Sequence, residues 1–291
     1  AQHIADIAVT LQARPGREVV VVSLARAGTP IGVLLHRALG VLGKQSKHYC
    51  VSIIRDRGVD WQALDYICAN HRGEDIVFVD GWTGKGVITR ELAASVSDYN
   101  RSRGTSIDPA LWVVADLAGS ATVGATEEDY LIPNAVLNAT VSGLISRTVL
   151  STLYVGEGDF HACAYYEDKL GEDLSRFYVD ELTPQVITAL AFAQLTVWSE
   201  ETRRSLNQVS NAFVEAMMAQ FDVERNHVKP GVGESTRAML RRVPDRLLLK
   251  DPSAPDVQHL IRLADEKNIV VERVEDMPYR AAVIIKSVSN E

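Results

Sequence analysis

Short apolar runs alternate with amphipathic segments through the first half of the chain. The runs are rich in β-branched residues and nearly continuous in apolar character, which is typical of strands buried on both faces of a parallel sheet. The segments between them are long enough to form crossover helices. We predict strands at Val19–Leu24, His48–Ile54, Asp75–Asp80 and Leu111–Asp116, and helices at Pro30–Leu42, Trp61–Asn70 and Gly86–Tyr99. The first half is therefore predicted to be an α/β domain with helices on both faces of its sheet.

A different pattern begins near Asp180. Thr183–Phe221 contains no Gly and is rich in Ala, Leu, Gln and Glu, which predicts one or two long helices with a break near Trp198. Thr183 is the expected N-cap, and Pro184 then falls in the first turn. A smaller α/β unit follows, with helices predicted at Glu234–Arg242 and Asp256–Lys267 and strands at Arg246–Lys250, Val270–Val274 and Ala281–Ser287. We expect a domain at residues 1–180, a helical connector at 181–223 and a small domain at 224–291.

Composition narrows the class of protein. No apolar run approaches the roughly 18 residues that a membrane span needs. The three cysteines have no metal-like spacing, so we expect neither a disulfide framework nor a zinc site, and we predict a cytoplasmic protein. The net charge of −8 argues against nonspecific binding of nucleic acid. Arg225–Lys250 nevertheless holds seven basic and two acidic residues, which indicates either a nucleic-acid contact or a solvated helix face.

The strongest chemical signal is a strand that ends in Asp80 and leads through a short loop into a helix. Such a loop turns backbone N–H groups toward one point, and the helix N-terminus adds positive potential, so both favour a phosphate. A nucleoside-triphosphate loop is excluded because Val79 and Gly86 stand where its pattern needs Gly and Ser or Thr. An ordinary strand–helix turn is the alternative. The candidate ligand-binding residues are Asp80, Gly81, Thr83, Gly84, Lys85 and Gly86.

Two further loops carry arginines. The first follows Val19–Leu24, and its small residues allow close backbone approach while Arg26 supplies charge for a pyrophosphate. The second contains Arg55 and Arg57 beside a Gly hinge, where they could close over a leaving group or form a solvent-exposed turn. The first loop contributes Ser23, Ala25, Arg26, Ala27 and Gly28 as candidates.

These segments together resemble a known family. VSLARAGTPIGVLLHRAL, IVFVDGWTGKGVITREL, EEDYLIPNAVLNATVSGLISRT and DFHACAYYED are similar to bacterial phosphoribosyltransferases with a C-terminal Pelota-like RNA-binding domain, encoded near tellurite-resistance and stress-response genes. The resemblance implies a type I phosphoribosyltransferase fold and transfer from phosphoribosyl pyrophosphate (PRPP) to an unknown acceptor, with Mg²⁺ held mainly by PRPP. Some relatives are labelled cysteine protease. Relatives start further upstream, so the resemblance places Ala1 inside a longer protein.

The resemblance assigns roles to the candidate residues. It implies that Asp80 orients the ribose, that 83–86 seats the 5′-phosphate, and that Arg26 with Arg55 or Arg57 neutralises the pyrophosphate. Two departures weaken the match, because Gly81 replaces a second acid and Gly86 replaces a Thr. The alternative to catalysis is a regulator that senses PRPP and acts on RNA.

The last third resembles the Pelota and kink-turn-binding superfamily, whose Gly-x-Asn-Glu-x-x-Lys segment meets RNA at a helix start. Here Gly233 replaces the Asn and Arg237 replaces the Lys, so phosphate contacts survive and base reading is weakened. The resemblance predicts binding of structured RNA. The predicted RNA-binding residues are Gly231, Gly233, Glu234, Arg237 and Arg241.

Other residues remain as weaker candidates. Trp82, Arg147 and His161 are assigned to a substrate pocket. Cys163 lies near His161 and Asp159 in the sequence, which suggests a thiol nucleophile, but no oxyanion hole can be identified and we do not favour a peptidase. Apolar positions of Thr183–Phe221 are interpreted as core or as the interface of a homodimer.

Overall fold

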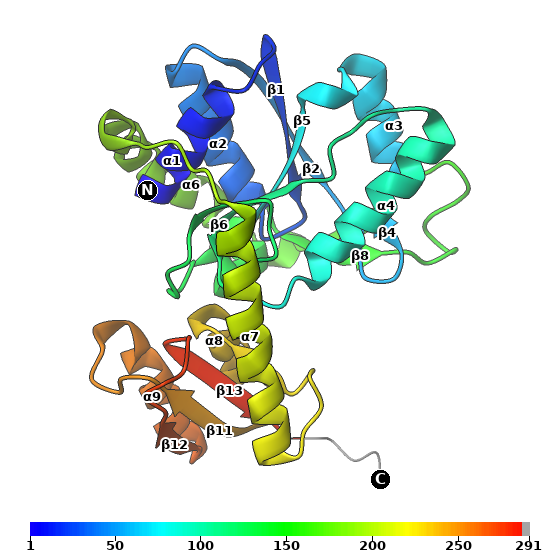
Figure 1. Cartoon of the computed structure of the whole chain (residues 1–291). Coiled ribbons are helices and arrows are strands. Elements are labelled where there is room, and N and C mark those ends of the chain that lie inside the picture. Colours follow the sequence, from blue (N-terminus) through cyan, green and yellow to red (C-terminus); the bar gives the residue numbers. More distant parts are fainter. Residues whose placement is uncertain (287–291) are drawn as a thin grey trace.

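Five parallel strands in the order β2-β1-β5-β6-β7 form the main sheet of the computed structural model, which describes residues 1–286 (Figure 1). Every residue of β6 is buried, as expected for a strand covered on both faces. The predicted α/β class is confirmed. The strands are β1 (Glu18–Leu24), β2 (Gln45–Val51), β5 (Ile76–Thr83), β6 (Leu111–Asp116) and β7 (Val123–Thr126).

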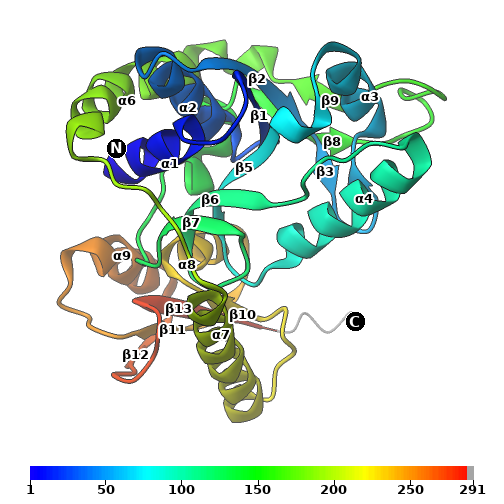
Figure 2. The same ribbon diagram turned by 45° about the horizontal axis from the view of Figure 1, so that its top comes forward.

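Helices cover both faces of this sheet, as predicted (Figure 2). Alternate residues of β1 point to opposite sides, so Val19 and Val21 contact one group of helices while Val20 and Val22 contact the other. The first group is α1 (Gln2–Gln12), α2 (Thr29–Val41) and α6 (Ser175–Ala189), and the second is α3 (Trp61–Asn70) and α4 (Val87–Arg103). No helix among residues 1–286 combines the length and apolarity that a membrane crossing requires.

Two antiparallel ribbons extend the carboxyl side of the domain. β3 (Ile53–Ile54) pairs with β4 (Gly58–Val59), and β8 (Ile145–Val149) pairs with β9 (Ala162–Tyr165). The second ribbon is tied to the first parallel strand by Arg26, whose Nη1 donates to the carbonyl oxygen of Ile145 at 2.6 Å. The short elements nearby are η1 (Gly73–Asp75), α5 (Asn134–Leu137), η2 (Asn138–Val141) and η3 (Glu167–Glu172).

The helical region differs from its prediction at one end. The first helix, α6, begins at Ser175, so Pro184 lies in its interior and Thr183 is not an N-cap. Arg37 Nη1 donates to the Asp180 carboxylate and to Thr183 Oγ1, both at 2.8 Å, and holds α6 against α2. These contacts and apolar packing on α1 and α2 favour a continuous helix despite the hydrogen bond that proline removes.

A break follows α6, and the second helix belongs to the small domain. The break comprises η4 (Leu190–Phe192) and an extended segment, and α7 (Glu200–Phe221) begins at the Ser199 cap. Figure 1 shows α7 running down from the first domain along the small sheet. Phe213, Val214 and Met217 of α7 pack against that sheet, so this half of the helix completes its core.

The small domain has a four-stranded mixed sheet in the order β10-β13-β11-β12. Its other helices pack on the face opposite α7, so the sheet is covered on both sides. Ser287, the last residue of a predicted strand, lies outside the described residues. The elements are β10 (Val228–Pro230), α8 (Val232–Arg241), β11 (Pro244–Leu249), η5 (Pro255–Val257), α9 (Gln258–Lys267), β12 (Val270–Arg273) and β13 (Ala281–Ile285).

One buried carboxylate joins the two domains. Asp129, only 5% exposed, accepts hydrogen bonds from the backbone N–H groups of Val232 at 2.7 Å and Arg280 at 2.8 Å. Both donors belong to the small domain, and Val232 is the first residue of α8. Gly231 before it has a φ of +89°, which favours glycine, and a Cβ there would lie 2.8 Å from Leu117. Asp129 therefore fixes the start of α8 against the first domain.

We predict that Asp129→Ala lowers the free energy of unfolding by more than about 2 kcal/mol, because hydrogen bonds to a charged group contribute about 1.5–3 kcal/mol each. Urea titration followed by fluorescence measures the change. The exposed Asp168→Ala is the control, since the Asp168 side chain makes no hydrogen bond among residues 1–286. Equal stability of the two variants would show that Asp129 does not anchor the junction.

Candidate functional site

A pocket of about 310 Å³ opens at the carboxyl ends of β1 and β2, between α3 and the β8–β9 ribbon. Its walls combine apolar side chains with thiol, imidazole, hydroxyl and carboxyl groups, which is typical of a site for a small molecule or an extended peptide. The lining residues with reactive or polar side chains are Cys50, Ser52, Asp60, Ser146, Thr148, His161 and Cys163.

A hydroxyl pair holds the imidazole of His161. Its Nδ1 lies 2.9 Å from Ser52 Oγ, which in turn lies 2.7 Å from Thr148 Oγ1. The backbone N–H of His161 donates to Asp60 Oδ2 at 2.7 Å, while Asp60 Oδ1 caps α3 by accepting from Gln62 and Ala63. Three separate segments thus fix the ring, and Nε2 is left as its second proton-transfer atom.

Cys163 lines the same pocket as this imidazole. It is in β9, two residues after His161, and pairs with Thr148 of β8. Its side chain is exposed and lines the same pocket as the ring. The exposed thiol and the oriented imidazole are the two groups that nucleophilic catalysis by cysteine requires.

Cys50 also lines the pocket but has a different environment. It is exposed, but surrounding protein atoms raise the pKa of its thiol, and Thr29 Oγ1 lies 3.0 Å from the sulfur. The neighbouring His48 Nε2 is engaged with Ser23 Oγ at 2.8 Å, and burial lowers the pKa of His48 to about 4. Cys50 is therefore a neutral thiol whose nearest imidazole stays neutral and engaged.

The remaining thiol lies elsewhere. Cys68 is half-buried on α3, where burial raises its pKa and the Tyr99 hydroxyl lies next to it. It does not line the pocket. Of the three cysteines, only Cys50 and Cys163 share a pocket with a histidine.

The strand that carries Asp80 is longer than predicted. β5 continues to Thr83 and pairs with β6 through that residue, so Asp80 lies within the strand and the loop begins at Gly84. Thr83 Oγ1 donates to buried Asp116 at 2.5 Å. Gly86 precedes α4 with a φ of +67°. This left-handed conformation favours glycine, so the backbone explains the residue at this position. The threonine hydroxyl is thus committed to the core of the protein.

Lys85 forms a contact between the domains. Its Nζ donates to the carbonyl oxygens of Arg225 at 2.8 Å and Val228 at 3.0 Å. Burial is the largest cause that lowers its pKa to about 8, and nearby Lys229 adds to it. The lysine therefore points toward the small domain rather than into the pocket.

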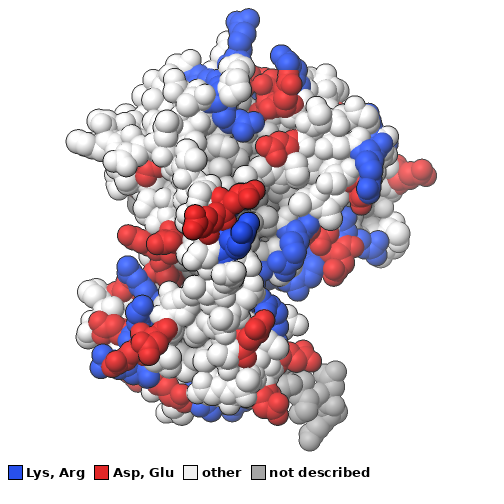
Figure 3. Space-filling view, viewed as in Figure 1, with Lys and Arg blue, Asp and Glu red and all other residues white. Residues whose placement is uncertain are grey.

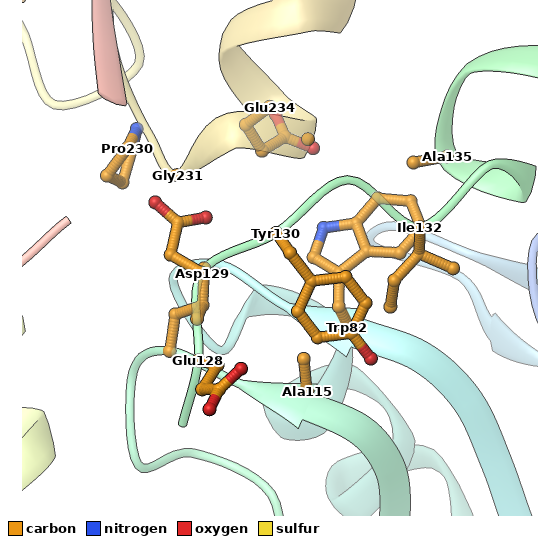
Figure 4. Close-up of a pocket in the computed structure, with 12 residues that line it drawn as sticks. Trp82, Ala115, Glu128, Asp129, Tyr130, Ile132, Ala135, Pro230, Gly231 and Glu234 are labelled. Carbon is orange, nitrogen blue, oxygen red and sulfur yellow. The ribbon is translucent and has the colours of Figure 1, made fainter. Parts of the chain in front are cut away.

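The small domain covers this end of the sheet. Arg237 of α8 stacks over Trp82 with its guanidinium carbon 5.9 Å from the ring centroid, and Glu234 pairs with Arg237 at 3.0 Å. Figure 4 shows Trp82, Asp129 and Glu234 around the space that remains. That space is about 10 Å³, room for about one water molecule. The predicted phosphate loop and the predicted RNA-binding helix start therefore face each other across a nearly filled junction.

The first arginine loop lies between the junction and the pocket. Ser23 is buried and bonded to His48, Ala25 lines the pocket, and Ala27 accepts a hydrogen bond from the Asn134 amide through its carbonyl oxygen. Gly28 is required by packing, since a Cβ there would lie 2.8 Å from the Val79 carbonyl oxygen.

The second arginine segment is a tight turn. Arg55 and Arg57 are exposed in the turn between β3 and β4, and the backbone N–H of Asp56 donates to Glu91 at 2.9 Å. The turn is thereby attached to α4. The structure thus brings neither arginine to the pocket lining.

The predicted RNA-binding residues of α8 and the three predicted substrate-pocket residues do not form one site. Some of them line the junction between the domains and others line the pocket or its ribbon. Gly231 and Gly233 line the small space beside Trp82, whereas His161 lines the large pocket. Arg147 is exposed on β8, and Arg241 donates to the Val136 carbonyl oxygen at 3.1 Å. Contact of the α8 residues with RNA stays a prediction.

Five of the reactive or polar pocket residues were not predicted from the sequence, although Ser52 and Asp60 flank the Arg55–Arg57 segment. They are Cys50, Ser52, Asp60, Ser146 and Thr148. The signal that could have found Cys50 and Ser52 is that both lie in the predicted strand His48–Ile54, which brings a thiol and a hydroxyl to the carboxyl end of the sheet. The magnesium prediction stays untested: Mg²⁺ was to be held by PRPP, and residues 1–286 contain no metal-like cluster of three His, Cys, Asp or Glu side chains.

Burial raises the pKa of Asp80 to about 7, against the opposing effects of the Gly81 N–H, which donates to it at 2.7 Å, and of the Arg237 charge. Between about pH 4 and pH 7 the native carboxyl keeps a proton that the unfolded chain has lost. The stability contribution of this group therefore falls as the pH rises through that window and is constant above it.

We accordingly predict that Asp80→Asn is more stable than the wild type at pH 8 by more than about 1 kcal/mol, the equivalent of one pKa unit, and that the difference disappears near pH 4. Urea titrations at both pH values measure it. Asp98→Asn, on an exposed position of α4, is the control. A difference that is the same at both pH values would contradict a buried, protonated Asp80.

Solved structures with some likeness to the chain are hypoxanthine phosphoribosyltransferases. One from Trypanosoma cruzi is 14% identical, covers 45% of this chain and 78% of its own, and has a TM-score of 0.32. A variant of the T. cruzi enzyme with its ternary substrates complex is also 14% identical, covers 56% and 88%, and has a TM-score of 0.31. Likeness at this level supports no argument about this chain.

Sequence relatives give a different result. A curated relative, "Cysteine protease StiP" from Acinetobacter baylyi, is 38% identical over 297 residues, which is 98% of this chain and 77% of the relative. The family model described as "Tellurite-like stress resistance cysteine protease StiP" matches residues 1–183, and that of the "PELOTA RNA binding domain" matches 208–287.

These matches correct two expectations. The protease descriptions overturn the predicted PRPP transferase and its PRPP-sensing alternative, and they contradict our view that a peptidase is not favoured. The tellurite-stress association and the Pelota-like domain agree with the prediction. The chain belongs to the family described as tellurite-like stress resistance cysteine protease StiP.

Proposed function

We propose that this chain is a cysteine-dependent hydrolase of amide bonds, with Cys163 as nucleophile and His161 as general base. The observation that carries the proposal is the pocket in which an exposed thiol and an imidazole held by the Ser52–Thr148 hydroxyl pair lie together. The relative and the family are both named cysteine protease, which supports the same class of reaction.

The mechanism follows from the hydrogen bonds of the ring. In the tautomer that carries a proton on Nδ1, this atom donates to Ser52 Oγ, and Nε2 carries the lone pair that accepts the thiol proton. The Cys163 sulfur attacks the carbonyl carbon, the imidazolium returns the proton to the departing amine, and a thioester remains. Water then attacks the thioester, His161 takes its proton, and the acid product leaves as the thiol is restored.

The pocket also indicates why Cys163 is chosen over Cys50. A thiol needs a base and an accessible sulfur to become a nucleophile, and a raised pKa makes a cysteine less reactive. Both cysteines are exposed, but surrounding protein atoms raise the pKa of Cys50 and its neighbour His48 is bonded to Ser23, whereas Cys163 shares the pocket with the imidazole of His161. We assign Cys50 to the wall that the bound substrate contacts.

We predict that Cys163→Ala abolishes hydrolysis of a denatured protein substrate, while Cys68→Ala, the matched control outside the pocket, leaves it at the wild-type rate. Alkylation with iodoacetamide, followed by mass spectrometry of the peptides, should label Cys163 faster than Cys50. Loss of activity in Cys50→Ala with full activity in Cys163→Ala would overturn the assignment. Absence of hydrolysis in the wild type against a broad peptide library would overturn the proposed class of enzyme.

Ser52 is proposed as a positioning residue that acts through His161. Ser52→Ala removes the partner of Nδ1 and should lower kcat by about 10-fold or more with little change in KM, since general-base catalysis contributes about 10²–10⁴-fold. The pH–rate profile separates this role from a structural one, because its acid limb, which reports His161, should move. Ser46→Ala, at a hydroxyl on β2 that contacts only the exposed His36, is the control. An unchanged profile in Ser52→Ala would contradict the assignment.

A further inference from the structure

Four arginines from both domains gather beside the junction. Arg26 and Arg147 belong to the first domain, and Arg237 and Arg241 lie on α8 of the small domain. Burial and then the charges of the neighbouring arginines lower the pKa of Arg241. Burial is also the largest cause that lowers the pKa of Arg26, with smaller contributions from the charges of Arg147 and Arg237. The contacts agree with this: Arg26 donates to Ile145, two residues before Arg147 on β8, and Arg241 of α8 donates to Val136 on α5 of the first domain, so positive charge from both domains meets at the junction.

Protein groups satisfy this cluster only in part. Arg237 pairs with Glu234. Arg26 donates to the Ile145 carbonyl oxygen at 2.6 Å and contacts the Tyr166 hydroxyl, and Arg241 donates to the Val136 carbonyl oxygen at 3.1 Å and to the Asn138 amide oxygen. Arg147 makes no ion pair with any residue between 1 and 286. Each guanidinium carries five N–H donors, so every arginine of the cluster keeps donors for another partner, and within the described residues Arg147 keeps all of its own. On the face drawn in Figure 3, basic and acidic side chains both lie around the waist where the two domains meet.

The chemistry of the cluster favours phosphate groups. Guanidinium forks pair with phosphates in a bidentate manner, and a polyanion relieves the repulsion among several arginines at once. Two of the four lie on α8, within the region that matches the RNA-binding domain family. RNA supplies repeated phosphates at this surface, which a single small anion does not.

We propose that Arg26 and Arg147 extend the RNA-binding surface of the small domain onto the first domain, so that one RNA strand bridges both. The family resemblance already implies that RNA contacts the start of α8. The new part of the proposal is the contribution of Arg26 and Arg147 from the first domain. Arg26 and Arg147 contact the phosphate backbone, so they contribute affinity and salt dependence rather than sequence specificity.

This site adjoins the thiol pocket. Ala25, next to Arg26, lines the pocket, and so do Ser146 and Thr148, while Arg147 between them does not and is exposed on the β8–β9 ribbon. An RNA strand held by these arginines runs along the outside of the ribbon that forms the pocket wall, and there it restricts the entry of a polypeptide substrate. This consequence rests on the proposed hydrolase, and it makes RNA an inhibitor of hydrolysis.

The test measures binding of a fluorescein-labelled RNA stem-loop to the full chain by anisotropy, between 50 and 300 mM KCl. Arg26→Gln and Arg147→Gln should each weaken binding about 5- to 10-fold and reduce the slope of log affinity against log salt by about one. Arg101→Gln and Arg176→Gln are the matched controls, because both side chains are exposed and pair only with neighbours on their own helices. The controls should bind as the wild type does.

Three results would overturn the proposal. The wild type could show no salt-dependent RNA binding, the first-domain variants could bind as tightly as the controls while Arg237→Gln does not, or a mononucleotide could bind as tightly as the stem-loop. The second result would confine RNA to the small domain, and the third would indicate a site for a small anion. Thermal unfolding of each variant checks that the fold is retained.

RNA affinity is also measured in Cys163→Ala, which should bind as the wild type does. RNA binding by a variant without hydrolase activity would show that the RNA-binding proposal does not depend on the hydrolase proposal. Where hydrolysis is present, saturating RNA should reduce it for the wild type, and the reduction should be lost in Arg147→Gln at the same RNA concentration. Unchanged hydrolysis at saturating RNA would overturn the inhibition.

Discussion

The buried carboxylate of Asp129 is the interaction on which the arrangement of the two domains depends. It accepts backbone hydrogen bonds at the start of α8 and before β13, so one side chain fixes both a helix and a strand of the small domain. A carboxylate left without these donors in a buried place would be costly, and this cost favours the docked state. Docking then covers the end of β5 and leaves the open pocket on the β1–β2 side.

Docking of the small domain gives the segment after Asp80 a structural role. A strand, a loop of small residues and a helix can bind phosphate when the loop is free. Here Thr83 donates to Asp116, Lys85 donates to carbonyl oxygens of the small domain, and Trp82 lies under Arg237. The side chains of Thr83, Lys85 and Trp82 are thus engaged by protein partners, and they contribute to the junction between the domains.

The pocket is built from less conspicuous residues. Its imidazole and exposed thiol come from β9 and the segment before it, the orienting hydroxyls come from β8 and the end of β2, and a carboxylate of the α3 cap holds the backbone. Because these segments are far apart in the chain, the network forms only when the β8–β9 ribbon folds back over the carboxyl end of the sheet. Its reactive groups are thereby placed beside the arginines of the junction.

The sequence by itself determined the α/β class and most helices and strands of the first domain, because hydrophobic periodicity depends on local spacing. It also determined a chemically rich loop after β5 and a basic stretch on α8. Only the tertiary structure decided that α6 begins before Pro184, that Asp80 lies within a strand, and that His161 meets Ser52. Each of these depends on contacts between segments far apart in the chain, such as Arg37 with Asp180 or β5 with β6. Local pattern carries no information about such pairs, since their free energy arises only once the chain has packed.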